Sequence, residues 1–132
     1  MENLEVGVVG EVRRTVEDRH TARHLGSGNV SVLATPIMVG LMEEAAIAAV
    51  DHLLPEGQQT VGIHLDVRHL APTPVGMEVV ARAELTDIDG RILKFRVTAE
   101  DENEQVGDGT HTRAIIDMAR FQGRIAKKQT SE

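Results

Sequence analysis

One segment restricts the possible folds of this chain more than any other. Residues 36–54, PIMVGLMEEAAIAAVDHLL, are rich in strong helix formers and stop before Pro55 and Gly57, which predicts a single long helix. The segment is apolar on nearly every side, as is typical of a helix surrounded by other structure. Four ionisable residues inside it exclude a membrane span.

Most of the remaining chain predicts β-strands. Residues 5–17 alternate loosely in polarity, and the polar, glycine-rich residues 18–34 predict a loop with a short helical turn. Four further strands in a meander and a short closing helix follow, with a hairpin signal at Asp89-Gly90. The strands cover residues 61–68, 77–86, 91–99 and 104–116, and the helix covers 118–129. We expect one α+β domain over residues 1–132, in which a curved antiparallel sheet wraps the central helix and open edges favour pairing with a second copy.

The composition excludes several classes of function. The formal net charge is −7, and the chain has no Trp, no Tyr and two Phe, so neither nucleic acid nor an anionic membrane is an expected partner. It has no cysteine, which excludes disulfides, thiolate metal sites and a cysteine nucleophile and fits a cytoplasmic protein. The N-terminal residues show no signal-peptide pattern, so a cytoplasmic location is expected.

Glu43 is the first candidate for chemistry. Successive helical residues differ by about 100° around the axis, which places Glu44 and Asp51 on one polar side and Glu43 on an apolar side. An isolated carboxylate in apolar surroundings is costly, and such carboxylates concentrate at active sites. The alternative is that Glu43 reaches solvent or pairs with an arginine.

His69 is the second candidate. It has the same strand parity as Val61, Ile63, Leu65 and Val67, so its imidazole is expected on their apolar face, whereas His64 faces outward. A histidine on an apolar face is more often a hydrogen-bonded core residue than a catalyst. The inward direction predicted for both Glu43 and His69 favours a shared site.

Thr35 is the third candidate, and it also suits the N-cap position of the helix, with Pro36 at the first helical position. The free N–H groups and the positive dipole end of the first helical turn favour stabilisation of an oxyanion. Eight residues separate Thr35 from Glu43, which is about 12 Å of helix rise. Substrate or water can span that gap, or a second subunit can supply the threonine.

Other motifs carry less information. Gly62, inside a predicted strand, indicates either close backbone approach of a ligand or a local twist. The histidines lack zinc-ligand spacing, and the patterns G-x-G-x-x-G and G-x-S-x-G are absent. We therefore expect no metal and no organic cofactor.

Four blocks of the sequence together resemble the fluoroacetyl-CoA thioesterase group of the hot-dog superfamily. They are ARHL at 22–25, TPIMVGLMEEA at 35–45, VGIHLDVRHLAPTPVGM at 61–77 and GDGTHTRAIID at 107–117. The blocks occur in order and cover most of the chain.

The resemblance implies a hot-dog fold, a homodimer with its active site at or near the subunit interface, and hydrolysis of a small acyl-CoA to the free acid and CoA. The implied catalytic residues are Thr35, Glu43 and His69, and the implied substrate-binding residues are Gly62, Arg113 and Asn29. Asn29 stands where the family has a phenylalanine gate, and Pro36-Ile37 replace Gly-Phe after the threonine. The resemblance therefore does not extend to selectivity for fluoroacetyl-CoA.

Two alternatives remain open at this stage. The first is a hot-dog protein that binds acyl-CoA or another small ligand without hydrolysing it. The second is another hot-dog enzyme such as a hydratase, which needs an Asp–His pair. The best available pair is Asp66 with His69, and these two residues have opposite strand parity.

Overall fold

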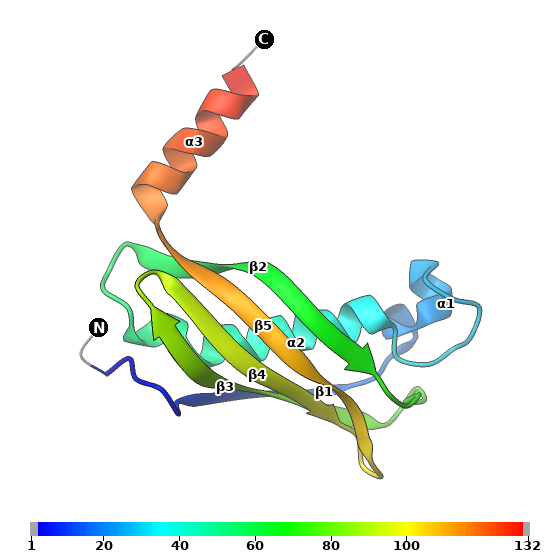
Figure 1. Cartoon of the computed structure of the whole chain (residues 1–132). Helices are drawn as coiled ribbons and strands as arrows, with labels where there is room; N and C mark the ends of the chain where they lie inside the picture. The colour runs from blue at the N-terminus through cyan, green and yellow to red at the C-terminus, as the bar shows by residue number, and fades with distance from the viewer. Residues whose placement is uncertain (1–2, 131–132) are drawn as a thin grey trace.

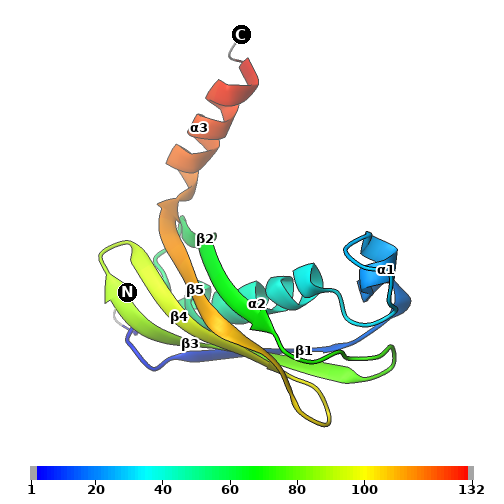
Figure 2. The same ribbon diagram turned by 45° about the vertical axis from the view of Figure 1, so that its right-hand side comes forward.

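The fold consists of one long helix lying in the concave face of a five-stranded antiparallel sheet (Figures 1 and 2). The computed structural model describes residues 3–130, so the outermost residues of the expected domain, 1–2 and 131–132, lie outside the described part. The strands are β1 (Val9–Thr15), β2 (Gln58–His69), β3 (Glu78–Asp89), β4 (Ile92–Glu100) and β5 (Gln105–Asp117), and the helices are α1 (Ala22–Leu25), α2 (Thr35–Val50) and α3 (Met118–Thr130). The expected helix wrapped by a curved antiparallel sheet, a half-barrel, is confirmed.

The order of strands in the sheet is β1-β3-β4-β5-β2, so the predicted meander is confirmed for β3, β4 and β5 and is wrong for β2. The tight turn after Asp89, with Gly90 at φ 61°, makes neighbours of β3 and β4. Residues 70–77 contain two prolines and no tight hairpin turn. They lead the chain away from β2, which pairs instead with β5 and forms an edge of the sheet.

The hydrophobic core lies between α2 and the sheet. Its largest fully buried side chains come from both layers: Met38, Leu41 and Met42 on the helix, and Leu85, Leu93 and Phe95 on the strands. The opposite side of α2 carries Ile47, which is 41% exposed. The expectation that other structure surrounds the helix is therefore met on one side only within residues 3–130.

A β-bulge changes which residues of β2 face the helix. The pairing register with β5 shifts between Gly62 and His64, and the intervening Ile63 is 55% exposed. Gly62 before the bulge and Leu65 after it lie opposite Arg113 and His111, both of which are buried. The sequence predicts one inward face for all odd-numbered residues from Val61 to His69. That prediction is wrong for Val61 and Ile63, because the residue inserted at the bulge reverses the alternation before it.

No helix within residues 3–130 combines the length and the apolar character needed to cross a membrane. Helix α3 extends from the end of β5 away from the sheet (Figure 1). The segment between β1 and α2 folds back beside the start of α2, and its short helix α1 lies at that end of the molecule (Figure 2).

Candidate functional site

Thr35 and His69 lie in direct contact where helix α2 begins and strand β2 ends. The Thr35 hydroxyl is 2.7 Å from Nδ1 of His69. The N-cap residue of α2 is Ala34, so the prediction that Thr35 is the cap is wrong by one position. The Thr35 hydroxyl hydrogen-bonds to an imidazole instead of to the backbone of the first turn.

The environment of His69 keeps its ring neutral near pH 7. Burial lowers the pKa of His69 below its ordinary value of 6.5, because the charged ring loses hydration. Its Nε2 atom is buried and has no hydrogen-bond partner among the described residues. A neutral imidazole next to a hydroxyl group is suited to accepting a proton from it.

A cavity of about 380 Å³ opens at the Thr35–His69 pair. Its wall is mostly aliphatic and includes Asn29, the residue expected at the position of the aromatic gate. The lining residues are Ala22, Ser27, Gly28, Asn29, Val30, Val32, Leu33, Thr35, His69, Leu70, Ala71 and Pro72. Apart from the His69 ring, none of these side chains is ionisable, so the cavity suits an uncharged group.

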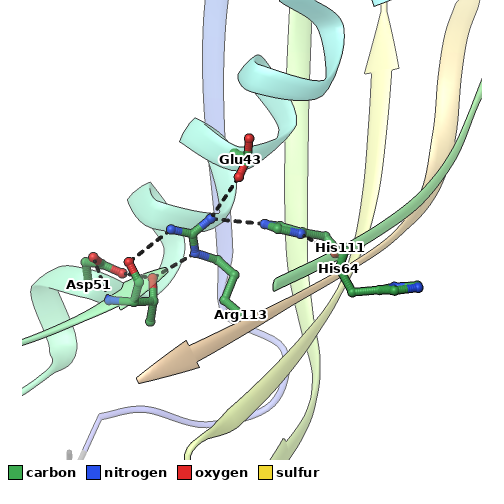
Figure 3. A network of polar contacts seen from close by, with 6 residues as sticks. Glu43, Asp51, His64, His111 and Arg113 are labelled. Carbon is green, nitrogen blue, oxygen red and sulfur yellow. Dashed lines mark hydrogen bonds and ion pairs between the residues drawn. The ribbon is translucent and has the colours of Figure 1, made fainter. Parts of the chain in front are cut away.

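Glu43 belongs to a second cluster, farther along α2 (Figure 3). Its Oε2 atom lies 3.6 Å from Nη1 of Arg113, and the two side chains are 37% and 4% exposed. The carboxylate thus pairs with an arginine and also reaches solvent, which is the alternative that the sequence left open. Glu44, as predicted, is exposed, and it pairs with Arg14 at 2.9 Å.

Gly62 makes room for this ion pair. A Cβ atom at Gly62 would lie 2.5 Å from Oε2 of Glu43 and 3.2 Å from Nη1 of Arg113. Any larger residue would therefore displace the carboxylate or the guanidinium.

The second cluster also contains Asp51, Thr60 and His111, to which the sequence analysis gave no role in the site. Arg113 donates from Nε to the Thr60 hydroxyl at 2.8 Å, and its Nη1 lies 3.1 Å from Nε2 of His111. Asp51 accepts from the Thr60 hydroxyl at 2.6 Å, so it does not share a solvent-facing side with Glu44. The alternation of His111 and Arg113 along β5 signals an inward polar row that the sequence analysis did not use.

The structure brings some predicted site residues together and separates others. Thr35, His69 and Asn29 share the cavity, whereas Glu43, Gly62 and Arg113 form the second cluster. No hydrogen bond or ion pair within residues 3–130 joins Glu43 to Thr35 or His69.

The first turn of α2 offers fewer free amides than expected. Ile37 and Met38 both donate their N–H groups to the Ala34 carbonyl, and Pro36 has no N–H. In this turn, the N–H group left free is that of Thr35, which makes no hydrogen bond within residues 3–130.

Two other possibilities for the site find no support in the described residues. Across residues 3–130 no three His, Cys, Asp or Glu side chains gather closely enough to hold a metal ion. Asp66 is exposed and lies on the opposite face of β2 from His69, so these two residues do not form the Asp–His pair that a hydratase needs.

Comparison with known proteins relates the chain to one group of enzymes. The family model described as fluoroacetyl-CoA-specific thioesterase matches residues 16–119. A fluoroacetyl-CoA thioesterase from Streptantibioticus cattleyicolor is 41% identical over 97 residues, which cover 74% of this chain and 70% of that protein.

Solved structures give the same relationship. A variant of the fluoroacetyl-CoA-specific thioesterase FlK superposes with a TM-score of 0.89 at 35% identity, covering 97% of this chain and 99% of that one. A thioesterase superfamily member from Thermus thermophilus superposes with a TM-score of 0.90 at 28% identity, covering all of both chains. A hot-dog-like protein from Thermanaerovibrio acidaminovorans has a TM-score of 0.90 at 22% identity and supports the fold alone.

Proposed function

This chain belongs to the fluoroacetyl-CoA-specific thioesterase family, and we propose that Thr35, Glu43 and His69 carry out its reaction. It is a thioester hydrolase that converts an acyl-CoA to the free acid and CoA. The observation that carries the assignment of residues is the 2.7 Å contact between the Thr35 hydroxyl and His69 Nδ1 at the mouth of the aliphatic cavity.

The proposed reaction uses the acyl carbonyl bound near the start of α2. The Thr35 N–H and the positive end of the helix dipole stabilise the negative charge that develops on the carbonyl oxygen. Glu43 either attacks the carbonyl carbon or removes a proton from the attacking water. In the general-base route, His69 takes this proton from Glu43 and passes it to the departing CoA thiolate. In the nucleophilic route, CoA leaves as the thiolate and the acyl group stays on Glu43 as a mixed anhydride; water then hydrolyses the anhydride, and His69 moves a proton of that water to the thiolate. In both routes Thr35 orients the attacking group through its hydroxyl.

We further propose a homodimer in which each active site takes Thr35 and His69 from one subunit and Glu43 from the other. Two observations support this arrangement. Thr35 and Glu43 are separated by about 12 Å of helix rise within one chain. The edge strand β2 and the open side of α2 expose Ile63 and Ile47, and edge strands and apolar faces of this kind are commonly covered by a second copy.

We also propose the substrate-binding residues, the domain organisation and the location of the protein. Asn29, Gly62 and Arg113 stay our proposed substrate-binding residues: Asn29 lines the cavity, and Gly62 and Arg113 flank Glu43. The site lies within what we take to be one domain over residues 1–132. We place the protein in the cytoplasm, in keeping with a sequence that has no cysteine.

The assignment of the catalytic residues is tested by measuring CoA release from a panel of short, branched and halogenated acyl-CoA esters. Replacement of Thr35, Glu43 or His69 by alanine is expected to lower kcat about 10²–10⁴-fold, the usual effect of losing a general acid or base. Losses below about tenfold in all three variants would contradict the assignment. If the wild-type protein binds the esters but releases CoA no faster than the Glu43→Ala variant does, the protein is a binding protein and not a hydrolase.

The shared active site is tested by mixing two inactive variants. Thr35→Ala and Glu43→Ala subunits are unfolded together, refolded and assayed. If residues of two subunits form each site, half of the dimers are mixed and each has one intact site, so about a quarter of wild-type activity returns. If one subunit supplies all three residues, every site in the mixture is defective and no activity returns.

A further inference from the structure

A chain of polar contacts with Thr60 and Arg113 buried in its middle connects the C-terminal end of α2 to the Glu43 carboxylate (Figure 3). The Asp51 carboxylate accepts from the Thr60 hydroxyl at 2.6 Å and from the Thr60 N–H at 3.2 Å. Arg113 donates to the Thr60 hydroxyl from Nε at 2.8 Å and to the Thr60 carbonyl from Nη2 at 3.1 Å. The remaining nitrogen, Nη1, faces Glu43 at 3.6 Å.

The chemistry of these groups allows one direction for the chain of hydrogen bonds. The Nε atom of Arg113 only donates, and an ionised Asp51 only accepts. The Thr60 hydroxyl has one proton, so it donates that proton to Asp51 and accepts from Arg113. Without the Thr60 hydroxyl, the Nε–H of a nearly fully buried guanidinium loses its acceptor.

His111 fixes the other end of the Arg113 guanidinium. Its Nδ1 is 2.8 Å from the His64 carbonyl, which only accepts, so Nδ1 carries the proton and Nε2 accepts from Nη1 of Arg113 at 3.1 Å. Burial, together with the positive charge of Arg113, lowers the pKa of His111 below its ordinary value of 6.5. The ring therefore stays neutral and serves as an acceptor.

We propose that Thr60, oriented by Asp51, is a positioning residue that holds Arg113 and, through Arg113, fixes the Glu43 carboxylate. This inference rests on the proposed function only in taking Glu43 as the reacting carboxylate. An exposed glutamate held by one ion pair is normally weakly ordered, because solvent screens the pair. Here the arginine is immobilised by three other hydrogen bonds, so Glu43 pairs with a fixed partner.

The kinetic test compares two threonines in matched surroundings. Thr60→Val removes the hydroxyl and keeps the shape, whereas Thr60→Ser keeps the hydroxyl. Thr73 is fully buried and donates to Asp101 at 3.0 Å, outside the cluster, so Thr73→Val controls for the loss of a buried Thr–Asp hydrogen bond.

Thr60→Val is expected to lower kcat about ten- to a hundredfold, the effect of a misplaced catalytic group, and to raise KM by a smaller factor, because Arg113 is also a proposed substrate-binding residue. Thr60→Ser is expected to restore most of kcat, and Thr73→Val to leave it unchanged. Equal kcat in Thr60→Val and Thr73→Val, or a loss in Thr60→Val that serine does not restore, would overturn the proposal.

Crystal structures of the variants provide a readout that does not depend on turnover. The Glu43 carboxylate is expected to leave Arg113 in Thr60→Val and to remain beside it in Thr60→Ser. An unmoved carboxylate in Thr60→Val overturns the inference even if wild type hydrolyses none of the esters, which is the separate failure of the proposed function. If Thr60→Val does not fold, Asp51→Ala replaces it, because this variant removes the acceptor of the Thr60 hydroxyl. The same displacement of Glu43 is expected, and an unmoved Glu43 would overturn the inference.

Discussion

Gly62 faces Glu43 so closely that a methyl group on its Cα would lie 2.5 Å from the Oε2 atom of the carboxylate. That separation is well inside van der Waals contact, and the neighbouring Arg113 nitrogen and the His111 ring would lie at 3.2 Å. The absence of a side chain at Gly62 is therefore a condition for the observed position of Glu43.

Gly62→Ala is accordingly expected to lower kcat about tenfold or more while the protein remains folded, because the carboxylate at the end of its side chain can turn into solvent. Steady-state kinetics and thermal unfolding measure the two effects. Gly123→Ala is the control, since a methyl group on its Cα would meet nothing within 4 Å apart from the neighbouring backbone of its own helix α3, which extends away from the sheet. A Gly62→Ala enzyme with wild-type kcat would show that the position of Glu43 is not critical.

The sequence predicts the parts of this fold that local signals determine, and it misses those that pairing between distant segments determines. The long helix that begins at Thr35 and the Asp89-Gly90 hairpin follow from helix formers, prolines and a turn glycine, although α2 ends at Val50, short of the predicted residue 54. The bulge at Ile63 and the pairing of β2 with β5 depend on segments about fifty residues apart. No local pattern contains that information.

The candidate site divides in the same way. The predicted inward direction of His69 is correct because His69 and Leu65 both follow the bulge and keep the same alternation. The prediction also relied on Val61, which precedes the bulge and lies on the other face, so its success at His69 is accidental. The partners of Glu43 cannot be identified by spacing, because Arg113 lies seventy residues away in the chain. Asp51 turns toward Thr60 because α2 ends at Val50 and continues as a 3-10 turn, which ideal helical angles do not anticipate.

The lowered pKa of His69 predicts the pH dependence of the reaction. Burial disfavours the charged ring, so the catalytically useful neutral form persists below pH 6.5. We expect the acid limb of kcat/KM to be centred below pH 6.5, where His69 of the free enzyme takes up a proton. An acid limb centred above pH 6.5 would contradict the assigned role of His69.

Stability is expected to fall in acid for a related reason. The pKa values of His69 and His111 are both lowered by burial, so the unfolded chain binds more protons than the folded protein just below pH 6.5. The contribution of these two histidines to the free energy of unfolding is therefore complete above pH 6.5. It is lost as the pH falls from 6.5 through their folded-state pKa values. Urea unfolding at several pH values measures this, and the decrease is expected to be smaller in His69→Asn.

Gly10 on β1 allows the strand to pack directly on the backbone of α2. A Cβ atom there would overlap the carbonyl oxygen of Ala45 and the amide nitrogen of Ala49, neither of which can rotate away. Gly10→Ala is expected to reduce the free energy of unfolding by about 1–3 kcal/mol, the usual cost of overpacking. Denaturant unfolding beside Gly123→Ala tests this, and equal stability of the two variants would refute close packing of β1 on α2.

The lining of the cavity beside Thr35 and His69 predicts which acyl groups the enzyme accepts. Butyryl-CoA and succinyl-CoA have acyl chains of equal length, but succinyl carries a carboxylate for which the lining offers no cationic side chain. Burying an unpaired carboxylate is costly, so kcat/KM for butyryl-CoA is expected to exceed that for succinyl-CoA at least tenfold, which corresponds to about 1.4 kcal/mol. Asn29→Lys places a cation in the lining and is expected to narrow this ratio. Equal rates for the two esters in wild type, or a ratio that Asn29→Lys leaves unchanged, would show that the acyl group binds elsewhere.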